Sequence, residues 1–321
     1  MSNFEELGQD RTMLLDYKKI DPELLAFLEK MPPLDITRDN IADVRTMLAS
    51  RPQPASRVQV QETTDTVSTE DGDVGVCIYR KTSAENQPAL LWIHGGGYVL
   101  GDAVEERARI FADKFDCTVV SVDYRLAPEH PFPAGPNDCL ATLYWMEDES
   151  ERLGINPKRI AIGGASAGAG MAAGVAMMSR DRGGPALTFQ LLLYPMIDNL
   201  HATESGQFEN HPIWNQGTSL NAWEMYLGGT PGADASPYAA ASRADDLRGL
   251  PPTYICVGSE DLFRDESLEY ARRLMAASVP CEISVFPGVF HGGEMFVPHA
   301  AVSRRMQESI LAALGDAINK L

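Results

Sequence analysis

The stretch Gly164-Ala165-Ser166-Ala167-Gly168 decides the fold, because the chain changes its character on either side of the serine. The apolar run before it, residues 159–163, favours a β-strand, and the residues after it, 171–178, favour a helix. A glycine two residues before and two after the serine permits a strained backbone and a close approach of strand and helix. The stretch therefore predicts a strand, a sharp turn at Ser166 and a helix.

A serine on such a turn is presented at the end of a strand, which is the arrangement of a nucleophile elbow. In a segment rich in alanine and glycine the pattern also fits an ordinary turn, so other motifs must decide. One lies upstream, where an apolar strand runs into His94-Gly95-Gly96-Gly97. Acyl transfer needs N–H groups that side chains do not mask. We expect the oxyanion hole to consist of the amides of Gly96, Gly97 and Ala167.

An acid and a histidine follow two later predicted strands. Asp261 comes after the strand predicted over 253–257, and His291 after the one over 282–286. The carboxyl ends of parallel strands meet at one edge of a sheet, and serine, acid, histidine is the chain order of an α/β-hydrolase. We therefore expect Ser166 to be the nucleophile, His291 its general base and Asp261 the acid that orients the histidine.

Other acids and histidines fit structural roles better. Asp198 follows the preceding predicted strand and is the alternative acid of the triad. His94 belongs to the glycine-rich turn, where we expect it to brace the loop by hydrogen bonding. The remaining histidines, His130, His201, His211 and His299, are expected to be structural or solvated.

With these motifs in view, the chain resembles bacterial carboxylesterases of the hormone-sensitive-lipase family, also called family IV. The resemblance rests on the His94 to Tyr98 turn, the block 123–134, the elbow, the segment 261–266 and the turn at His291. It implies an α/β-hydrolase fold with a mainly parallel, eight-stranded sheet flanked by helices and a helical cap. It also implies a serine esterase.

The sequence departs from the family pattern at three places. Ala165 precedes the serine where the family usually has Asp or Thr, the acid turn reads Asp261-Leu262-Phe263, and Gly293 stands where Phe is usual. None of these changes removes a catalytic atom. They bear on the fit of the substrate more than on the chemistry.

The chain order of predicted elements supports one hydrolase core with a cap in two parts. Predicted strands cover 58–66, 74–80, 90–93, 118–123, 160–163, 188–193, 253–257 and 282–286. Predicted helices cover 21–30, 39–50, 105–115, 137–152, 167–179, 266–277 and 301–318. We assign 1–56 and 199–227 to the cap, and 57–198 and 228–321 to the core. The segment 199–227 is rich in aromatic residues and interrupts a connection too long for a simple crossover; an anchored surface loop is the alternative.

Three aromatic side chains are predicted to contact the substrate: Tyr98 and Tyr194 at strand ends, and Trp214 in the second cap segment. Packing in the core is the alternative for the two tyrosines.

Composition excludes several classes of function. The net charge of −18 argues against binding to nucleic acid or to an anionic membrane surface. No run of eighteen apolar residues predicts a membrane span, and we expect no signal peptide. The five scattered cysteines favour buried thiols in a cytoplasmic protein. No metal site and no cofactor are expected, and a homo-oligomer is left open.

The resulting hypothesis is a carboxylesterase that acts on small carboxylic esters, of short to medium chain length, through an acyl-enzyme. An amidase or peptidase on the same scaffold is one alternative. A non-catalytic ligand receptor is another, and the presence of Ser166, Asp261 and His291 argues against it.

Overall fold

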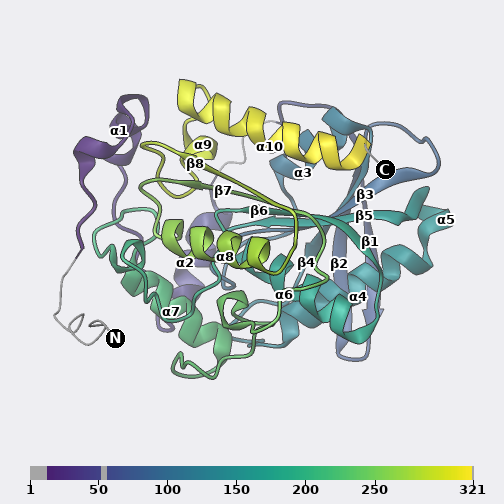
Figure 1. Ribbon diagram of the computed structural model, residues 1–321, viewed down its shortest axis with the longest axis horizontal. Coiled ribbons are helices and arrows are strands. Elements are labelled where there is room, and N and C mark those ends of the chain that lie inside the picture. Colours follow the sequence, from purple (N-terminus) through teal and green to yellow (C-terminus); the bar gives the residue numbers. More distant parts are fainter. Residues whose placement is uncertain (1–12, 52–55, 320–321) are drawn as a thin grey trace.

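The computed structural model describes residues 13–51 and 56–319, which are organised around one sheet of eight strands (Figure 1). The strand order is β1-β2-β4-β3-β5-β6-β7-β8. Strand β2 is antiparallel to both of its neighbours, and all other neighbouring strands are parallel. The strands are β1 (Gln61–Thr69), β2 (Gly72–Arg80), β3 (Gln87–Ile93), β4 (Thr118–Asp123), β5 (Ile155–Ala165), β6 (Leu187–Leu193), β7 (Thr253–Gly258) and β8 (Cys281–Phe286). The predicted α/β fold with a mainly parallel, eight-stranded sheet is confirmed.

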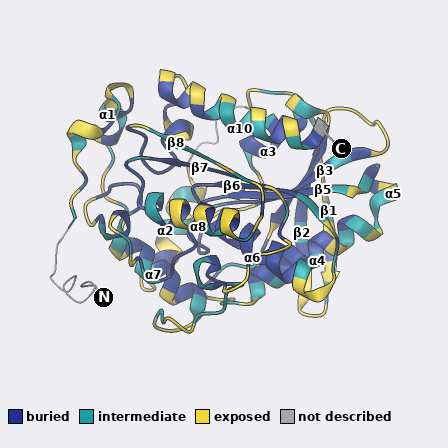
Figure 2. Ribbon diagram, viewed as in Figure 1, coloured by how far each residue is buried: buried dark blue, intermediate teal, exposed yellow. Residues whose placement is uncertain are grey.

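Helices cover both faces of this sheet. In Figure 1, α3 and α10 lie on one face, and α4, α6 and α8 lie on the other. The α-helices are α1 (Pro22–Leu28), α2 (Ile41–Ala49), α3 (Glu106–Phe115), α4 (Ala134–Asp148), α5 (Ser150–Leu153), α6 (Ala167–Arg182), α7 (Gln216–Leu227), α8 (Arg264–Ala276), α9 (Gly293–Phe296) and α10 (Ala301–Asn319). Because helices cover both faces, the central strands are buried along their length, as Figure 2 shows.

Two helix predictions need correction. The helix expected over 137–152 is two helices: α4 begins at Ala134, and the chain leaves the helical conformation at Glu149 before α5. Pro136 lies in the first turn of α4, where a proline removes no helical hydrogen bond, so it does not mark a boundary. The helix expected from Asp39 begins at Ile41, and Asn40, not the acid, holds the cap position.

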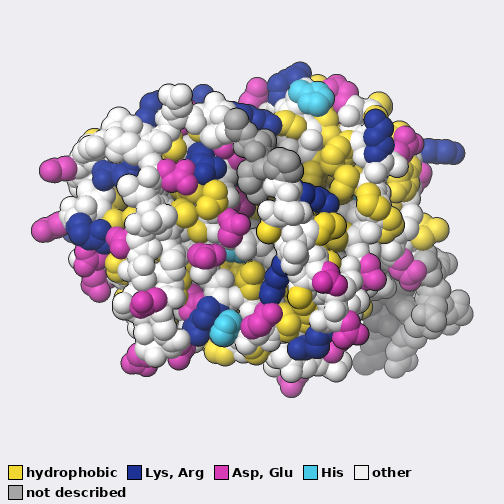
Figure 3. Space-filling model, turned by 180° about the vertical axis from the view of Figure 1, so that it is seen from behind, with side chains coloured by type: hydrophobic (Ala, Val, Ile, Leu, Met, Phe, Trp, Pro, Cys, Tyr) yellow, Lys and Arg dark blue, Asp and Glu magenta, His cyan; other side chains and the backbone are white. Residues whose placement is uncertain are grey.

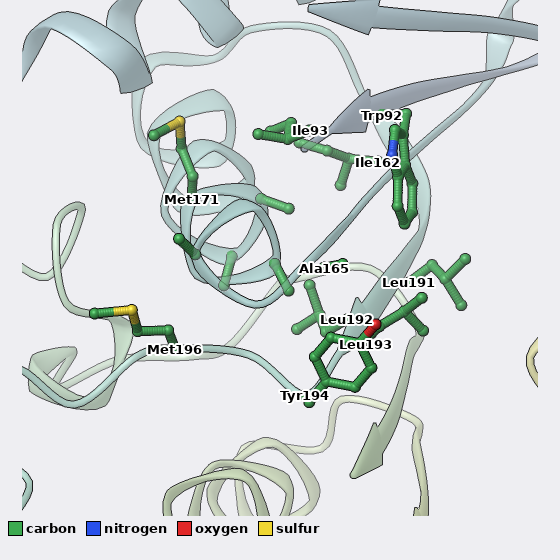
Figure 4. Packing of buried hydrophobic residues seen from close by; sticks show 14 of the residues in the cluster. Trp92, Ile93, Ile162, Ala165, Met171, Leu191, Leu192, Leu193, Tyr194 and Met196 are labelled. Carbon is green, nitrogen blue, oxygen red and sulfur yellow. The ribbon is translucent and has the colours of Figure 1, made fainter. Parts of the chain in front are cut away.

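The contact between β5 and α6 is made possible by glycines. A side chain at Gly164 would meet the backbone of Gly168, and a side chain at Gly168 would meet the carbonyl oxygens of Ile93 and His94. Helix α6 therefore begins in backbone contact with the end of β3. Figure 4 shows the apolar side chains of β3, β5 and β6, among them Ile93 and Leu192, packed around the first turns of this helix.

The described parts of the two predicted cap segments lie together at one end of the sheet. Figure 1 shows α1, α2 and α7 gathered there, away from α5. The Leu34 amide donates to the carbonyl of Pro212 over 3.0 Å, and the Thr218 hydroxyl donates to the carbonyl of Leu34 over 2.6 Å. Residues 1–12 and 52–55 of the first segment, including Phe4, lie outside the described residues.

Buried thiols and the absence of a membrane span were also expected from the sequence. All five cysteines are free; four are buried and Cys281 is half-buried. Cys117 directly precedes β4 and is buried. Within 13–51 and 56–319, no helix has the length and apolar character needed to cross a membrane.

Three fully buried histidines make stability depend on pH. Burial lowers the pKa of His94, His201 and His211 to about 4, so all three are neutral in the folded protein near neutral pH. An unfolded chain binds protons on these side chains below about pH 6.5, the ordinary value. The free energy of unfolding should therefore be fully retained above pH 6.5 and fall as the pH is lowered towards 4, by up to about 1.4 kcal/mol per pH unit for each histidine.

Urea denaturation between pH 7.5 and 4.5 measures this slope. His211→Asn keeps a hydrogen-bond acceptor close to the position of Nδ1 but cannot be protonated, so its slope should be smaller than that of the wild type. His299→Asn, at an exposed position, is the matched control. If the slope in His211→Asn equals that of the wild type, the lowered pKa of His211 does not contribute to the pH dependence of stability.

Candidate active site

Ser166 lies at the junction of β5 and α6 with a strained backbone. Its φ of 57° and ψ of −122° are unfavourable for a residue with a side chain. The strain is held by hydrogen bonds on both sides: the Ser166 amide donates to Leu193 over 2.9 Å, and the Ser166 carbonyl accepts from Met196 over 3.1 Å. These contacts fix the serine side chain at the carboxyl edge of the sheet.

His291 joins this serine to Asp261. The distance from Nε2 of His291 to Oγ of Ser166 is 3.0 Å, and Nδ1 lies 2.9 Å from Oδ2 and 3.1 Å from Oδ1 of Asp261. A carboxylate can only accept, so Nδ1 carries the proton and Nε2 presents its lone pair to the serine hydroxyl. The structure thus brings together the three residues that the sequence predicts for a triad.

The imidazole of His291 is held by aromatic rings as well as by hydrogen bonds. The rings of Tyr194 and Phe263 each meet it edge-on, with centroids 5.0 Å away. Asp261 is fully buried, and its Oδ1 also accepts from the Phe263 amide over 2.9 Å. The carboxylate and the imidazole therefore have few alternative orientations.

Asp198, the alternative acid, is engaged elsewhere. Its carboxylate forms an ion pair with Arg243 and accepts from the amides of Leu200 and Ala202. Nδ1 of His291 donates to Asp261 instead.

The glycine-rich turn lies directly beside the serine. A side chain at Gly95 would come within 2.8 Å of the Ala165 carbonyl and 3.4 Å of the Ser166 Cβ. Gly96 and Gly97 have φ values of 117° and 61°, which only glycine adopts readily. Ala167 is the first residue of α6, so its amide has no acceptor within the helix. The turn that carries Gly96 and Gly97 and the first residue of α6 thus both adjoin Ser166.

His94 and Tyr124 support the glycine-rich turn through hydrogen bonds and ring stacking. Nδ1 of His94 donates to the Gly95 carbonyl over 2.8 Å, as expected of a structural histidine, and its ring stacks on Tyr124 with centroids 4.2 Å apart. The Tyr124 hydroxyl donates to the His94 carbonyl over 3.0 Å. The block 123–134 thus supports the turn physically, which its sequence alone did not indicate.

Arg45 of α2 is a supporting residue that sequence analysis missed. Its Nε donates to the Val99 carbonyl over 2.9 Å and its Nη2 to the Ala127 carbonyl over 2.6 Å. It also pairs with Glu129 over 2.8 Å. Helix α2 is thereby attached to Val99, just after the glycine-rich turn, and to Ala127. One arginine in an amphipathic helix gives no signal of such a contact.

The three predicted substrate contacts occupy different places. The Trp214 ring lies against Gly97, where a Cβ would overlap it. Tyr98 is buried below the turn: its ring stacks on Tyr226 with centroids 3.9 Å apart, and its hydroxyl donates to the Met196 carbonyl over 2.8 Å. Tyr194 lies beside His291 and donates to Oε1 of Glu294 over 2.9 Å.

His211, which was expected to be structural or solvated, is buried and holds Trp214 in this position. Its Nδ1 accepts from the amides of Ile213 and Trp214, each over 3.2 Å, so its proton is on Nε2. Its ring also meets the ring of Phe290, the residue before His291, with centroids 6.1 Å apart. One buried histidine therefore connects the loop of the proposed base with the tryptophan on the glycine-rich turn.

Glu266 supports the segment that follows β6. Its Oε1 accepts from the amides of Ile197 and Asp198 over 2.7 and 3.1 Å, and burial raises the pKa of this carboxyl well above its ordinary value. The sequence suggested only that it begins a helix, and it does lie in the first turn of α8.

The described residues contain no cluster of His, Cys, Asp or Glu suited to a metal ion.

Comparison with known proteins identifies the family of this chain. The profile of a family described as alpha/beta hydrolase fold matches residues 90–295. Carboxylesterase NlhH of Mycobacterium tuberculosis is 36% identical over 298 residues, which cover 88% of this chain and 92% of that protein. An arylesterase of Saccharolobus solfataricus is 30% identical over 317 residues, which cover 92% and 98%.

Solved structures give the same result. A bacterial heroin esterase aligns with a TM-score of 0.87 at 37% identity, covering 94% of this chain and 99% of that one. Esterase LipW of Mycobacterium marinum also gives 0.87, at 36% identity and 95% and 98% coverage. The chain therefore belongs to the hormone-sensitive-lipase family of carboxylic ester hydrolases, which have the α/β-hydrolase fold.

Proposed function

We propose that this carboxylic ester hydrolase cleaves short- to medium-chain esters through an acyl-enzyme formed on Ser166. The observation that carries the proposal is the continuous path of hydrogen bonds from Oγ of Ser166 through His291 to Asp261. Oγ attacks the carbonyl carbon while Nε2 of His291 takes the hydroxyl proton. His291 then gives this proton to the departing alkoxide, and the alcohol leaves.

The second half of the reaction repeats these transfers with water. His291 takes a proton from a water molecule as its oxygen attacks the acyl carbon. The bond to Oγ then breaks, and His291 returns the proton to the serine, so that the carboxylic acid leaves. Asp261 stays ionised throughout and stabilises the imidazolium that forms in each half.

In both halves, negative charge develops on the substrate carbonyl oxygen. We assign its stabilisation to the amides of Gly96, Gly97 and Ala167, because the first two lie on the turn beside Ser166 and the third begins α6. The braces at His94 and Tyr124 keep this turn in place before substrate arrives. Such preorganised donors need little rearrangement in the transition state.

The contacts of the aromatic residues suggest separate roles. Trp214 lies over Gly97 and is the proposed wall of the substrate site. Tyr194 contacts His291 edge-on, so it both orients the base and borders the site. Tyr98 has its ring stacked and its hydroxyl bonded within the protein, so a supporting role fits it better than the predicted substrate contact.

Replacement of the proposed nucleophile tests the function directly. Ser166→Ala should lower kcat/KM for 4-nitrophenyl butyrate by roughly 10⁴-fold or more, because the triad acts as a unit. It should also abolish labelling by a fluorophosphonate. A different nucleophile would still be labelled in this variant, and a non-catalytic receptor would not be labelled even as the wild-type protein. Ser303→Ala, at a buried serine of α10, is the matched control. A folded Ser166→Ala enzyme with a tenth of normal activity would refute the assignment.

The two acids can be ranked in the same assay. Asp261→Asn should lower kcat by roughly 10⁴-fold, since Nδ1 of His291 loses its charged acceptor. Asp198→Asn should cost much less, and its effect should appear mainly in stability through the lost pair with Arg243. Comparing both at a temperature where each is folded separates the two effects. The opposite ranking would transfer the acid role to Asp198.

Acyl chain length tests the cap. Each methylene buried in the site adds about 0.8 kcal/mol, roughly a fourfold gain, until the space is full. We expect kcat/KM for 4-nitrophenyl esters to be greatest at four to eight acyl carbons. Trp214→Ala should move this optimum to longer chains. Trp145→Ala is the control and should not move it, because Trp145 lies on α4 and packs against Arg152 of α5. If kcat/KM still rises at sixteen acyl carbons, the proposed cap does not close the substrate site.

A further inference from the structure

Glu294 is a buried acid in α9, three residues after His291. On the face of the molecule shown in Figure 3, acidic and basic side chains are spread over the surface, where water solvates them. Glu294 is 0% exposed, so its charge must be balanced from within the protein. The hydrogen bonds within the triad do not involve this carboxylate.

Two donors from distant parts of the chain share one oxygen of Glu294. Nη2 of Arg107, on α3, donates to Oε1 over 2.6 Å, and the Tyr194 hydroxyl donates to the same atom over 2.9 Å. Arg107 supplies the opposite charge that a buried carboxylate needs. Its guanidinium also lies over the ring of Tyr194, 5.9 Å from the centroid. Glu294 and Arg107 therefore hold the hydroxyl and one face of the same tyrosine.

Tyr194 is held in one orientation by its backbone and by its hydroxyl. It follows β6 directly with a φ of 38°, and its amide donates to the Cys256 carbonyl over 2.6 Å. Burial raises the pKa of the hydroxyl well above its ordinary value, so the proton stays and the hydroxyl is a donor. The thioether of Met295 is a second acceptor, but it is weak and 3.7 Å away. The hydroxyl proton therefore forms the bond with Glu294.

The ring held in this way meets the imidazole of His291 edge-on, with centroids 5.0 Å apart. The hydrogen bonds to Asp261 fix the imidazole at Nδ1, while Nε2 must still point at Oγ of Ser166, 3.0 Å away. A misplacement of about 1 Å at a reacting atom can cost roughly two orders of magnitude in rate. The orientation of Tyr194 thus bears directly on proton transfer.

We propose that Glu294 is a positioning residue for the general base: by accepting from the Tyr194 hydroxyl, it holds that ring against His291. The inference rests on the proposed function, in which His291 takes the proton of Ser166. It gives the acid a role apart from stability, because a buried ion pair by itself often stabilises a fold little or not at all. Two apolar side chains of similar volume could replace the pair in packing, but they could not accept from Tyr194.

Two double variants separate these roles. Arg107→Met/Glu294→Met removes both charges and leaves the Tyr194 hydroxyl without its acceptor. Arg107→Met/Glu294→Gln also removes both charges, but the glutamine carbonyl can still accept from this hydroxyl. We expect kcat for 4-nitrophenyl butyrate to be roughly tenfold lower in the first variant than in the second, with KM within about threefold. The loss should be smaller than that of the base itself, because Phe263 still contacts His291.

Tyr194→Phe gives the second half of the test. It keeps the ring and removes only the hydroxyl, so it should lower kcat about as much as loss of the acceptor does. Added to Arg107→Met/Glu294→Met it should have little further effect, because both changes break the same hydrogen bond. Arg109→Met/Glu62→Met removes another arginine–glutamate pair, also with its arginine on α3, and as the matched control it should keep normal kcat. Thermal unfolding identifies a temperature at which all variants are folded.

The rate of labelling by a fluorophosphonate separates this inference from the proposed function. If the wild-type protein is not labelled at Ser166, the proposed function fails and this inference fails with it. If Ser166 is labelled, but the methionine and glutamine variants at Glu294 react equally fast, this inference alone is overturned. Additive effects of Tyr194→Phe and Glu294→Met would overturn it as well. If the methionine variant does not fold, Tyr194→Phe in the otherwise unchanged protein decides, and normal kcat with a normal labelling rate would refute the role.

Discussion

The backbone contact between the start of α6 and the end of β3 is the constraint on which the active site depends. Gly168 lies so close to the carbonyl groups of Ile93 and His94 that no side chain fits between them. This contact places the serine turn and the glycine-rich turn next to each other, although about seventy residues separate them in the chain. Between these turns Ser166 has a strained backbone, which is held by the hydrogen bond that its amide donates to Leu193 and the one that its carbonyl accepts from Met196.

Around this contact, polar groups are buried where partners hold them. Asp261 is shielded from water but accepts from His291 and from the Phe263 amide. Glu294 is equally buried and is paired with Arg107 and Tyr194. Removing one partner from such a pair leaves an uncompensated buried group, which costs several kcal/mol. Hence these residues both orient the site and couple its integrity to the stability of the fold.

Two of the departures from the family pattern have a physical explanation in the packing. At Gly293 an added Cβ would come within 3.4 Å of Leu24 of α1, so the N-terminal helix fills the space that a larger residue would need. In the acid turn, the Phe263 ring meets His291 edge-on while Leu262 is buried. The structure offers no reason for Ala165. Gly293 thus leaves room for α1 of the proposed cap.

The sequence by itself determined the strands, most helices and the order in which Ser166, Asp261 and His291 follow their strands. These features depend on local periodicity, on glycines at a strained turn and on the fact that parallel strands end at one edge. Helix starts were less predictable: a first turn tolerates a proline, as Pro136 shows, and either Asp39 or Asn40 is a residue type suited to the cap position of α2. Only the tertiary structure decided between Asp261 and Asp198, since both follow a strand and the choice depends on which carboxylate faces Nδ1 of His291. The supporting contacts of Arg45 with Val99, of Tyr124 with His94 and of His211 with Phe290 likewise arise between segments far apart in the chain. Such contacts leave no periodic trace in the sequence, because each depends on one side chain and on the distant backbone that happens to lie within its reach.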